Sequence, residues 1–540
     1  MKKLLAESNR YKPVLSAGRL QLSTLNYLCP AMKRKTRVRF APSPTGGLHL
    51  GGVRTVLYNY LFAKQQQGDF ILRIEDTDQS RYVAGAEDYI YQTLAWCGLT
   101  PDESPVHGGA FGPYRQSERK EIYRKYAEAL IQKDCAYYAF DTPEELEAMR
   151  TNLRKEENAA PQYDQTVRMQ MRNSLSLPKE EVDALLANET PHVIRIKMPE
   201  KETVAFTDMI RGEISFDTGT VDDKVLLKRD GMPTYHLAVV VDDYLMQITH
   251  AFRGEEWLPS APVHILLWKH LFGLEQMPQW AHLPLILGPN GKLSKRDGAK
   301  YGFPVFASAW TDPATGDVTE GFKERGFLPQ AFINLLAMLG WNAGTEQEVF
   351  SLDELVQQFS IEKVHKGGAH FDFEKAKWFN HEWLKRLDAQ TLAPYVKPFL
   401  EQKRIAVKDD RFLEKIIALI KDRCTLLPDF YEQGAFFFNP PTTLDTGGIK
   451  KWNRDKQQFF ENYADALSGV GDWEATSLES HFKEAAEGAG IKPGELQLPL
   501  RIMLVGGKFG PPVFEIAAVL ERTETAARIR YALERFEALL

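Results

Sequence analysis

Hydrophobic and polar positions change their period several times along the chain, which indicates several structural regions. Between residues 36 and 114, short β-prone apolar runs alternate with segments whose apolar residues recur at helical spacing. The runs lie at 36–40 and 69–74, and the helical segments at 53–61 and 85–94. Alternating strands and helices are typical of a parallel sheet covered by helices on both faces. We therefore predict the first half of a doubly wound α/β fold at residues 36–114.

A different mixture of elements follows at residues 115–225. The patterns predict helices at 119–133 and 143–157 and short strands at 192–197 and within 204–216. This region is interpreted as an α+β domain inserted between the two halves of the doubly wound (Rossmann-like) sheet. The second half is expected to span 226–299 and to resume with strands at 225–228 and 248–252.

Helical spacing dominates the rest of the chain, beginning with a predicted helix at residues 329–338. We expect one mainly helical domain at 300–387 and an all-α domain at 388–540. Three apolar stripes at helical spacing support this, namely Phe412, Ile416, Leu419 and Ile420; Phe459, Tyr463, Ala466 and Leu467; and Ile529, Leu533, Phe536 and Leu540. Such stripes are interpreted as core faces of helices and not as binding sites.

The first 35 residues differ in composition from the rest, with eight Lys or Arg residues and a single acid, Glu7. An organellar transit peptide has such a composition. The competing interpretation is that translation starts at Met32, directly before the first strand. We favour an upstream start or a disordered tail, and expect residues 1–35 to be an extension outside the fold.

Composition excludes several classes of protein. The 540 residues are 44% hydrophobic and 26% charged, and no apolar run approaches the ~20 residues that span a bilayer. The four cysteines occur singly, without a Cys-x-x-Cys pair, which argues against a disulfide framework and favours a reducing cytoplasm. The net charge is −6, so any contact with RNA must come from local positive patches on an acidic body.

The first motif with chemical content is the glycine-rich segment at residues 39–54, which follows the first predicted strand and opens a helix. Free backbone N–H groups and the helix dipole favour an anion at such a helix N-terminus. Gly51 and Gly52 would let a base or phosphate approach the backbone closely, and His49 can hydrogen-bond phosphate oxygens. Taken alone, an ordinary strand-to-helix turn with a helix-capping histidine explains the segment equally well.

A second motif lies at residues 291–298 and carries three cations within five positions, Lys292, Lys295 and Arg296. On a loop after an apolar run, these cations suit a polyphosphate whose charge grows during transfer. Gly291 and Gly298 would let this loop close over a bound nucleotide. A lone segment of this kind is more often a solvated basic turn.

Together, the two motifs resemble the two signatures of class I aminoacyl-tRNA synthetases. His-Leu-Gly-Gly at 49–52 resembles the first signature, and Lys-Leu-Ser-Lys-Arg at 292–296 resembles the second. The strings Ala-Pro-Ser-Pro-Thr-Gly at 41–46 and Leu-Arg-Ile-Glu-Asp-Thr-Asp at 72–78 narrow the resemblance to the glutamyl and glutaminyl group. Over residues 36–540 the chain resembles the bacterial type of glutamyl-tRNA synthetase.

This resemblance implies ATP-dependent ligation of L-glutamate to the 3′ end of its tRNA through a glutamyl-adenylate. Residues 115–225 would contact the acceptor end of the tRNA, 300–387 its stem and 388–540 its anticodon. Magnesium would enter with ATP. Some relatives carry a zinc knuckle in the insertion, but Cys135 and Tyr137 have no second thiol near them here, so no protein-bound zinc is expected.

The resemblance also implies a set of site residues. Glutamate has two carboxylates and an ammonium, so its site needs arginines as bidentate clamps and an acid. The residues implied to bind glutamate are Arg39, Ala41, Ser43, Glu75, Tyr235 and Arg253. The residues implied to bind ATP are Gly51, Gly52, Glu256, Leu285, Lys292, Lys295 and Arg296, and the implied catalytic residues are His49 and Lys295.

Two alternatives remain open at this point. A glutaminyl-tRNA synthetase shares the catalytic half but typically ends in β-barrels, which the helical C-terminal pattern disfavours. A small-molecule nucleotidyltransferase would suit the acidic net charge but leaves the insertion and the helical tail without a role. The resemblance further implies a cytoplasmic monomer that binds tRNA for glutamate and no membrane, with tRNA for glutamine as a second possible substrate.

Overall fold

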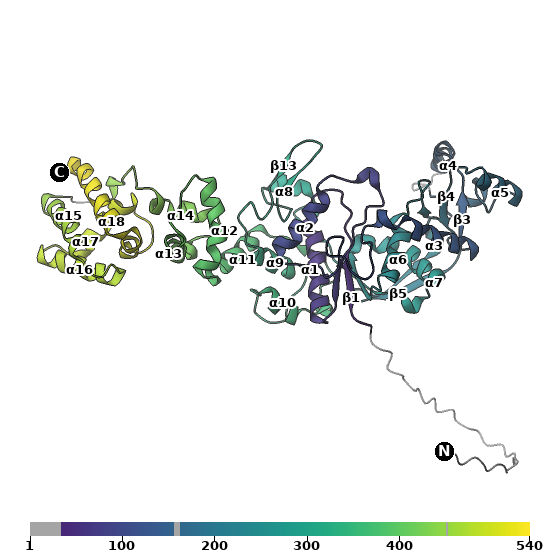
Figure 1. Cartoon of the computed structure of the whole chain (residues 1–540), viewed down its shortest axis with the longest axis horizontal. Helices are drawn as coiled ribbons and strands as arrows, with labels where there is room; N and C mark the ends of the chain where they lie inside the picture. Colours follow the sequence, from purple (N-terminus) through teal and green to yellow (C-terminus); the bar gives the residue numbers. More distant parts are fainter. Residues whose placement is uncertain (1–33, 156–161, 450–451, 540) are drawn as a thin grey trace, which may run out of the picture. The chain divides into compact units, whose positions relative to one another are not determined.

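The computed structural model describes residues 34–155, 162–449 and 452–539 (Figure 1). The expected extension at 1–35 therefore lies almost wholly outside the described residues, as does Leu540 of the last predicted stripe. The strands are β1 Arg37–Phe40, β2 Asp69–Leu72, β3 Ala136–Ala139, β4 Val193–Ile196, β5 Thr203–Asp208, β6 Gly212–Asp217, β7 Val225–Leu227, β8 His250–Gly254, β9 Gln279–Leu283, β10 Ile286–Gly288, β11 Gly291–Lys292, β12 Trp310–Thr311, β13 Val318–Thr319 and β14 Ala369–His370.

The helices occupy most of the remaining chain. They are α1 Leu50–Gln65, α2 Ala86–Cys97, α3 Lys120–Gln132, α4 Pro143–Lys155, α5 Lys179–Ala187, α6 Tyr235–Leu245, α7 Ala261–Leu271, α8 Lys295–Tyr301, α9 Pro329–Met338, α10 Leu352–Gln358, α11 Phe373–Arg386, α12 Ala389–Gln402, α13 Asp410–Ile420, α14 Asp429–Phe438, α15 Arg454–Ala466, α16 Ala475–Gly488, α17 Pro493–Val505 and α18 Val513–Phe536. No helix of the described residues combines the length and the apolarity needed to cross a lipid bilayer.

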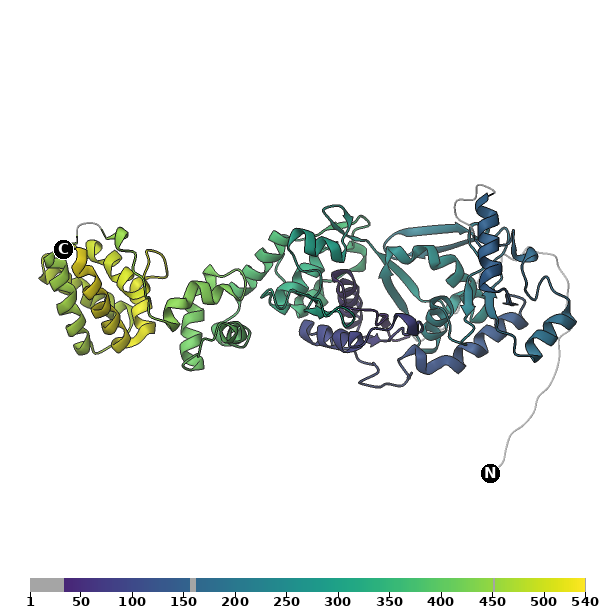
Figure 2. The same ribbon diagram turned by 90° about the horizontal axis from the view of Figure 1, so that it is seen from above.

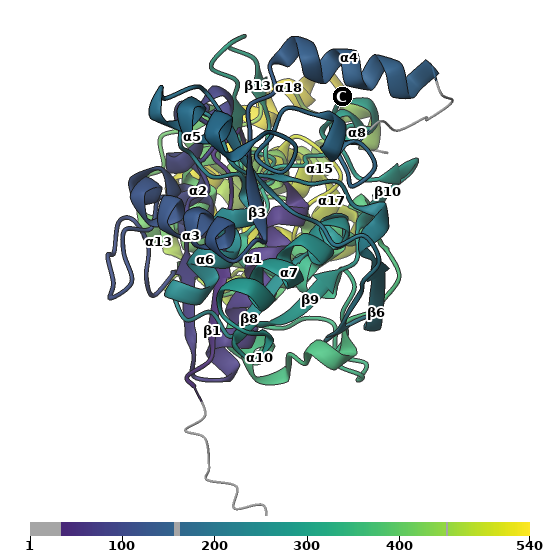
Figure 3. The same ribbon diagram turned by 90° about the vertical axis from the view of Figure 1, so that its right-hand side faces the viewer.

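A four-stranded parallel sheet in the order β2-β1-β8-β9 forms the centre of the nucleotide fold, and β1, β8 and β9 lie side by side in Figure 3. Successive side chains of a strand point to opposite faces of the sheet. In β8, Phe252 accordingly packs in the core shared with α1, whereas Ala251 packs in the core shared with α6 and α7. Helices therefore cover both faces, and the predicted doubly wound fold is confirmed.

The inserted region builds sheets of its own. β3, β4 and β7 form one antiparallel sheet, and β5 pairs with β6 in a hairpin. The strand predicted at 225–228 was expected to resume the parallel sheet, and this is wrong because β7 pairs antiparallel with β4, Val225 lying opposite Arg195. A short apolar strand fits either sheet by its pattern, and only the pairing distinguishes them.

The segment with three cations is also not the loop that its composition suggested. Gly291 and Lys292 form β11, which pairs with β10, and Lys295 begins α8. Ser294 starts this helix with a capping box, in which its side chain and backbone pair with Asp297. Gly298 lies inside α8, where an added Cβ would be 2.8 Å from the Phe303 carbonyl oxygen, so packing and not hinge motion requires a glycine there.

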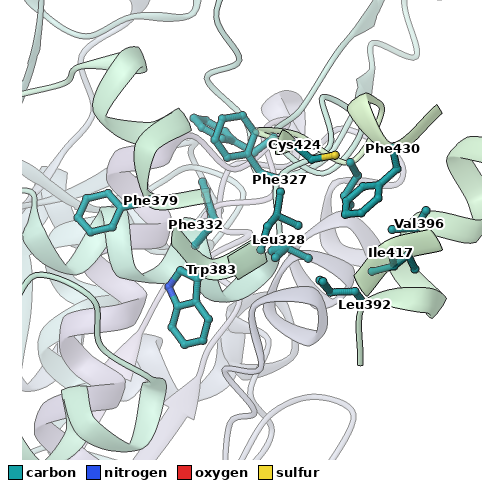
Figure 4. Close-up of a cluster of buried hydrophobic side chains, with 14 of the residues drawn as sticks. Phe327, Leu328, Phe332, Phe379, Trp383, Leu392, Val396, Ile417, Cys424 and Phe430 are labelled. Carbon is teal, nitrogen blue, oxygen red and sulfur yellow. The ribbon is translucent and has the colours of Figure 1, made fainter. Parts of the chain in front are cut away.

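One buried apolar cluster connects the mixed region around α9 with the helices that follow (Figure 4). Phe332 of α9 and Trp383 of α11 belong to it together with Leu392, Ile417 and Phe430 from α12, α13 and α14. Asn380 links the same two regions by hydrogen bonds. Its side-chain oxygen accepts from the Leu328 N–H (2.8 Å), and its amide donates to the Thr425 carbonyl (2.6 Å).

The last helices, α15 to α18, pack against one another and are coloured yellow-green to yellow in Figure 2. Of the predicted stripes, the buried members are Ile416, Ile420, Phe459, Tyr463, Leu467, Ile529, Leu533 and Phe536. Phe412 and Leu419 are half-buried, and Ala466 is exposed, so its place in the predicted stripe is wrong. The helical C-terminal region predicted from the stripes is confirmed.

Candidate functional site

A cavity of about 980 Å³ opens at the carboxyl ends of the parallel strands. Its walls come from the segments that follow β1, β2, β8 and β9, together with the N-terminus of α1. Ligands of open α/β sheets bind at this edge because the loops and helix N-termini converge there. Nearly all of the site residues implied by the sequence line this one cavity, namely Arg39, Ala41, Ser43, His49, Gly51, Gly52, Glu75, Tyr235, Arg253, Glu256, Leu285 and Lys292.

Two implied residues are not among those that line the cavity. Arg296 is exposed in the first turn of α8 and lies outside the lining, whereas the preceding Ser294 is part of it. The backbone of Lys295 begins α8, but its side chain lies outside the described part of the structure. The cavity therefore brings together the implied site residues from distant parts of the sequence, with the exception of Lys295 and Arg296.

The N-terminus of α1 forms one wall of the cavity. His49 is its N-cap residue, and the Nδ1 atom of His49 accepts a hydrogen bond from the Gly51 N–H at 3.3 Å. A Cβ on Gly51 would meet only this Nδ1 atom, at 3.8 Å, so the backbone of Gly51 is accessible to a ligand. A Cβ on Gly52 would lie 2.6 Å from the Leu48 side chain, so packing also requires this glycine.

A cluster of buried charged side chains surrounds Asp242 and Asp243 of α6. Arg39 donates from Nε and Nη2 to the two carboxylate oxygens of Asp243, at 3.0 and 3.1 Å. Arg73 donates to Asp243 (2.9 Å) and to Glu75 (3.2 Å), and its Nε lies 3.8 Å from Asp242. All these side chains are at most 9% exposed. Such close pairing is what makes charges tolerable inside a fold.

Two carboxyl groups of this cluster, Glu75 and Asp243, have pKa values shifted in opposite directions. Burial raises the pKa of Glu75 to about 7, although Arg73 and Arg39 oppose the rise. The pKa of Asp243 moves the other way: burial would raise it, but Arg39 and Arg73 outweigh that cost and hold it below its ordinary value. Asp243 is thus held as a carboxylate, whereas Glu75 titrates near neutral pH.

Arg253 of β8 also lines the cavity and is 7% exposed. Its Nε donates to His282 Nε2 (3.0 Å), and its Nη1 donates to the Tyr235 hydroxyl (3.1 Å) and to His264 Nδ1 (3.2 Å). The guanidinium also stacks over the Trp280 ring, 4.7 Å from its centroid. Within the described part of the chain, Nη2 is buried without a hydrogen-bond partner, so one strong donor is left for a ligand.

The side chains of Glu255 and Arg54 hold the backbone at Pro284 and Leu285. The Leu285 N–H donates to Glu255 Oε1 at 3.0 Å, and Arg54 donates to the carbonyl of the neighbouring Pro284. At the entrance, Lys292 Nζ lies 3.3 Å from Glu256 Oε1, so two residues implied to bind ATP pair with each other in this state. Both side chains of that pair are exposed, and such a pair separates at little energetic cost.

Side chains that could bind a metal ion are scattered over the described part of the chain. Among the described residues, no group of three or more His, Cys, Asp or Glu side chains is placed to hold an ion. Cys135 is half-buried, and its thiol donates to the Lys133 carbonyl.

Sequence reasoning missed several residues that line the cavity or contact its lining residues, namely Arg54, Arg73, Asp243, His264 and His282. One signal was available for the acids of α6, since Asp242 and Asp243 directly follow the buried apolar run 237–241. Acids are almost never fully buried unless they are paired. Their partners Arg39 and Arg73, however, lie on and directly after other strands, and no spacing in the sequence indicates that pairing.

Comparison with known proteins identifies the family. A model of "tRNA synthetases class I (E and Q), catalytic domain" matches residues 35–378, and an "Anticodon binding domain" model matches 391–533. Glutamate–tRNA ligases of Amoebophilus asiaticus and Christiangramia forsetii are 52% and 50% identical over 506 residues, which cover 93% of this chain and 98% and 99% of theirs. A crystal structure of a glutamate tRNA ligase from Elizabethkingia meningosepticum in complex with its amino acid matches with a TM-score of 0.85 at 48% identity, over 93% of this chain and 99% of that chain. The chain therefore belongs to the glutamate–tRNA ligases, a family of class I aminoacyl-tRNA synthetases.

Proposed function

We propose that the cavity binds ATP and L-glutamate together, forms an enzyme-bound glutamyl-adenylate, and transfers the glutamyl group to the 3′ end of tRNA. The observation that carries this proposal is the meeting, in one cavity, of the α1 N-terminus with the buried arginine–carboxylate cluster. A helix N-terminus suits phosphate, and paired arginines suit a dicarboxylic amino acid. The relatives give no support to a glutaminyl-tRNA synthetase or to a small-molecule nucleotidyltransferase.

The glutamate side of the cavity is assigned by the chemistry of its groups. Arg253 offers its unpartnered Nη2 to a substrate carboxylate, and Arg39, which lines the same cavity, adds positive charge. Glu75 in its ionised form receives the substrate ammonium. Ala41, Ser43 and Tyr235 line the same space and complete the pocket with backbone and hydroxyl groups.

The nucleotide side is assigned in the same way. The α1 N-terminus with His49, Gly51 and Gly52 holds phosphate oxygens, and Glu256 and Leu285 face the adenosine. Lys292, Lys295 and Arg296 then meet the charge that grows as pyrophosphate leaves. Magnesium enters with ATP as part of the substrate.

The reaction needs positioning and no protein nucleophile. A glutamate carboxylate oxygen attacks the α-phosphorus of ATP, and the bond from that phosphorus to the pyrophosphate oxygen breaks. A ribose hydroxyl of the tRNA then attacks the activated carbonyl and releases AMP, the hydroxyl proton being lost to solvent. Holding two reactants in line can supply several kcal/mol of the barrier, and fixed dipoles supply much of the rest.

We further propose the tRNA contacts implied by the resemblance, with the acceptor end at 115–225, the stem at 300–387 and the anticodon at 388–540. We also propose that the chain acts as a cytoplasmic monomer. Aminoacylation assays with purified tRNA for glutamate and tRNA for glutamine test the substrate choice. Charging of the first supports the proposal. ATP–pyrophosphate exchange that depends on another amino acid, and not on glutamate, would contradict it.

Replacing Lys295 by alanine should slow adenylate formation about a hundredfold, because one preorganised cation for the developing phosphate charge is lost. Single-turnover formation of glutamyl-adenylate with tRNA present measures the step, and filter binding measures tRNA affinity, which should stay within about twofold. Lys300→Ala in the last turn of the same helix is the matched control. Equal rates in Lys295→Ala and Lys300→Ala would refute the assigned role.

The raised pKa of Glu75, about 7, predicts a specific pH profile. Because ammonium binding needs the carboxylate, kcat/KM for glutamate should rise with pH through about 7 and then level off. In stability, the protonated group favours the folded state below its ordinary pKa of 4.5, and that contribution is lost as the pH rises to about 7. Glu75→Gln should lower kcat/KM and remove the rise, whereas Glu87→Gln, outside the cavity, should keep it. An unchanged rise in Glu75→Gln would assign the titration to another group.

A further inference from the structure

The contacts of Arg253 continue beyond the cavity as one directional chain of buried hydrogen bonds. On one side, His282 accepts from Arg253 and pairs through Nδ1 with Asp208 Oδ2 at 2.6 Å. On the other side, His264 accepts from Arg253, and its Nε2 lies 3.2 Å from His236 Nδ1. Asp208, His264 and His282 are each at most 2% exposed.

The chemistry of the groups determines where each proton lies. A guanidinium only donates, so His282 Nε2 and His264 Nδ1 must present lone pairs to Arg253. A carboxylate only accepts, so His282 carries its proton on Nδ1 and donates it to Asp208. His264 likewise carries its proton on Nε2 and donates it to His236. Each imidazole is therefore neutral and has one assigned tautomer.

The surrounding charges agree with neutral rings. Burial lowers the pKa of His236 to about 4, and burial together with Arg253 lowers the pKa of His264 well below its ordinary value. Burial also lowers the pKa of His282, against the effect of Asp208. All three rings are thus neutral at neutral pH, so that His264 and His282 accept from the Arg253 cation and do not compete with it.

Backbone N–H groups fix Asp208, the last group in this series of hydrogen bonds. Asp208 closes β5 of the inserted hairpin, and its Oδ1 accepts the N–H groups of Ile210 and Arg211, both at 2.9 Å. Its Oδ2 also accepts the His282 N–H at 3.1 Å. The carboxylate therefore cannot turn away from His282, and the inserted hairpin determines the orientation of a side chain in the cavity.

We propose that Asp208, His282 and His264 are positioning residues that hold Arg253 with only Nη2 free, and that they thereby set the preference for glutamate over glutamine. The inference rests on the proposed contact between Arg253 and a substrate carboxylate. A carboxylate accepts a charge-assisted hydrogen bond from Nη2, whereas glutamine can offer only its neutral amide oxygen, which makes a weaker bond. This difference in bond strength at one fixed donor favours glutamate over glutamine. A mobile arginine would relax this preference.

Asp208→Asn is the most direct test. Asparagine has nearly the same shape as aspartate, and its Oδ1 can still accept the N–H groups of Ile210 and Arg211. Its amide group would donate to His282 Nδ1, which drives the ring to the Nε2–H tautomer and sets an N–H against Arg253. We expect the KM for glutamate to rise about tenfold and glutamate-over-glutamine selectivity to fall about tenfold, each equivalent to one lost directional bond. The value of kcat and the KM for ATP should change by less than about threefold.

The control variant is Asp217→Asn at the other end of the same hairpin, where Asp217 accepts the exposed Gly219 N–H. A second pair tests the other side of the chain. His264→Asn places an oxygen near the Nδ1 position and should retain glutamate binding, whereas His264→Leu removes the acceptor and should not. Histidine ¹⁵N NMR of the full chain should show the His282 tautomer changing in Asp208→Asn alone.

Some results would overturn the inference. These are an unchanged KM for glutamate in both Asp208→Asn and His264→Leu, equal losses for ATP and glutamate, or His264→Asn behaving like His264→Leu. The proposed function fails separately, if replacing Arg253 itself leaves glutamate binding intact. Should Asp208→Asn not fold, the His264 pair decides by itself.

Discussion

Replacing Arg253 by methionine is expected to lower kcat/KM for glutamate by about four orders of magnitude. The substitution removes the donor left free at Nη2 and leaves three acceptors unpaired, on His264, His282 and Tyr235. Methionine has similar length and no charge, so the effect reports lost recognition more than a lost volume. The KM for ATP should change by less than about threefold, because the nucleotide wall does not involve Arg253.

Arg253→Lys separates charge from geometry. Lysine keeps the charge but not the planar fork that contacts three acceptors at once. We expect it to recover only part of the activity. Arg115→Met is the control, since Arg115 pairs with Glu87 outside the cavity. Aminoacylation kinetics at saturating ATP and tRNA measure all three variants, and a loss below about tenfold in Arg253→Met would contradict the assigned role.

Asp243→Asn is expected to lower the free energy of unfolding of the catalytic region by about 3–5 kcal/mol. The change leaves Arg39 and Arg73 buried without their shared carboxylate. Exposed pairs contribute under about 1 kcal/mol, so Asp465→Asn, which breaks the exposed pair with Arg530, serves as the control. Because a chain with several domains unfolds in more than one step, hydrogen exchange of peptides from β1 and α6 is the suitable measurement.

The pH dependence gives a second check on Asp243. The lowered pKa means that its contribution is present above pH ~4 and is lost as the pH falls below that value. Wild-type protein should therefore lose protection of α6 on acidification, and Asp243→Asn should lack this step. Protection that is equal in the two proteins at pH 7 would show that the buried arginines need no such partner.

Local patterns predicted the fold well where one element has one strong period. The helix expected at 329–338 is α9, and the strand expected at 69–74 contains β2. Errors arose where a pattern fits two structures. The short apolar strand β7 joined the inserted sheet, and the basic segment became a capped helix because Ser294 and Asp297 satisfy its first turn.

The candidate site shows the same division. Motifs in the sequence identified Arg39, His49, Glu75 and Arg253, which all line the cavity. They did not identify Asp243 or His282, since an acid in α6 and a histidine in β9 carry no local signature of their partners.

The sequence by itself determined the alternation of strands and helices, the glycine-rich start of α1 and the family to which the chain belongs. These follow from periodicity, glycine placement and short motifs, which act over a few residues. Only the tertiary structure decided which buried charges neutralise each other and which donor of Arg253 remains free. Those features depend on contacts such as Arg39 with Asp243 and Asp208 with His282, separated by 204 and 74 residues. Hydrogen-bond direction and burial at such contacts are properties of the folded chain, and no local pattern encodes them.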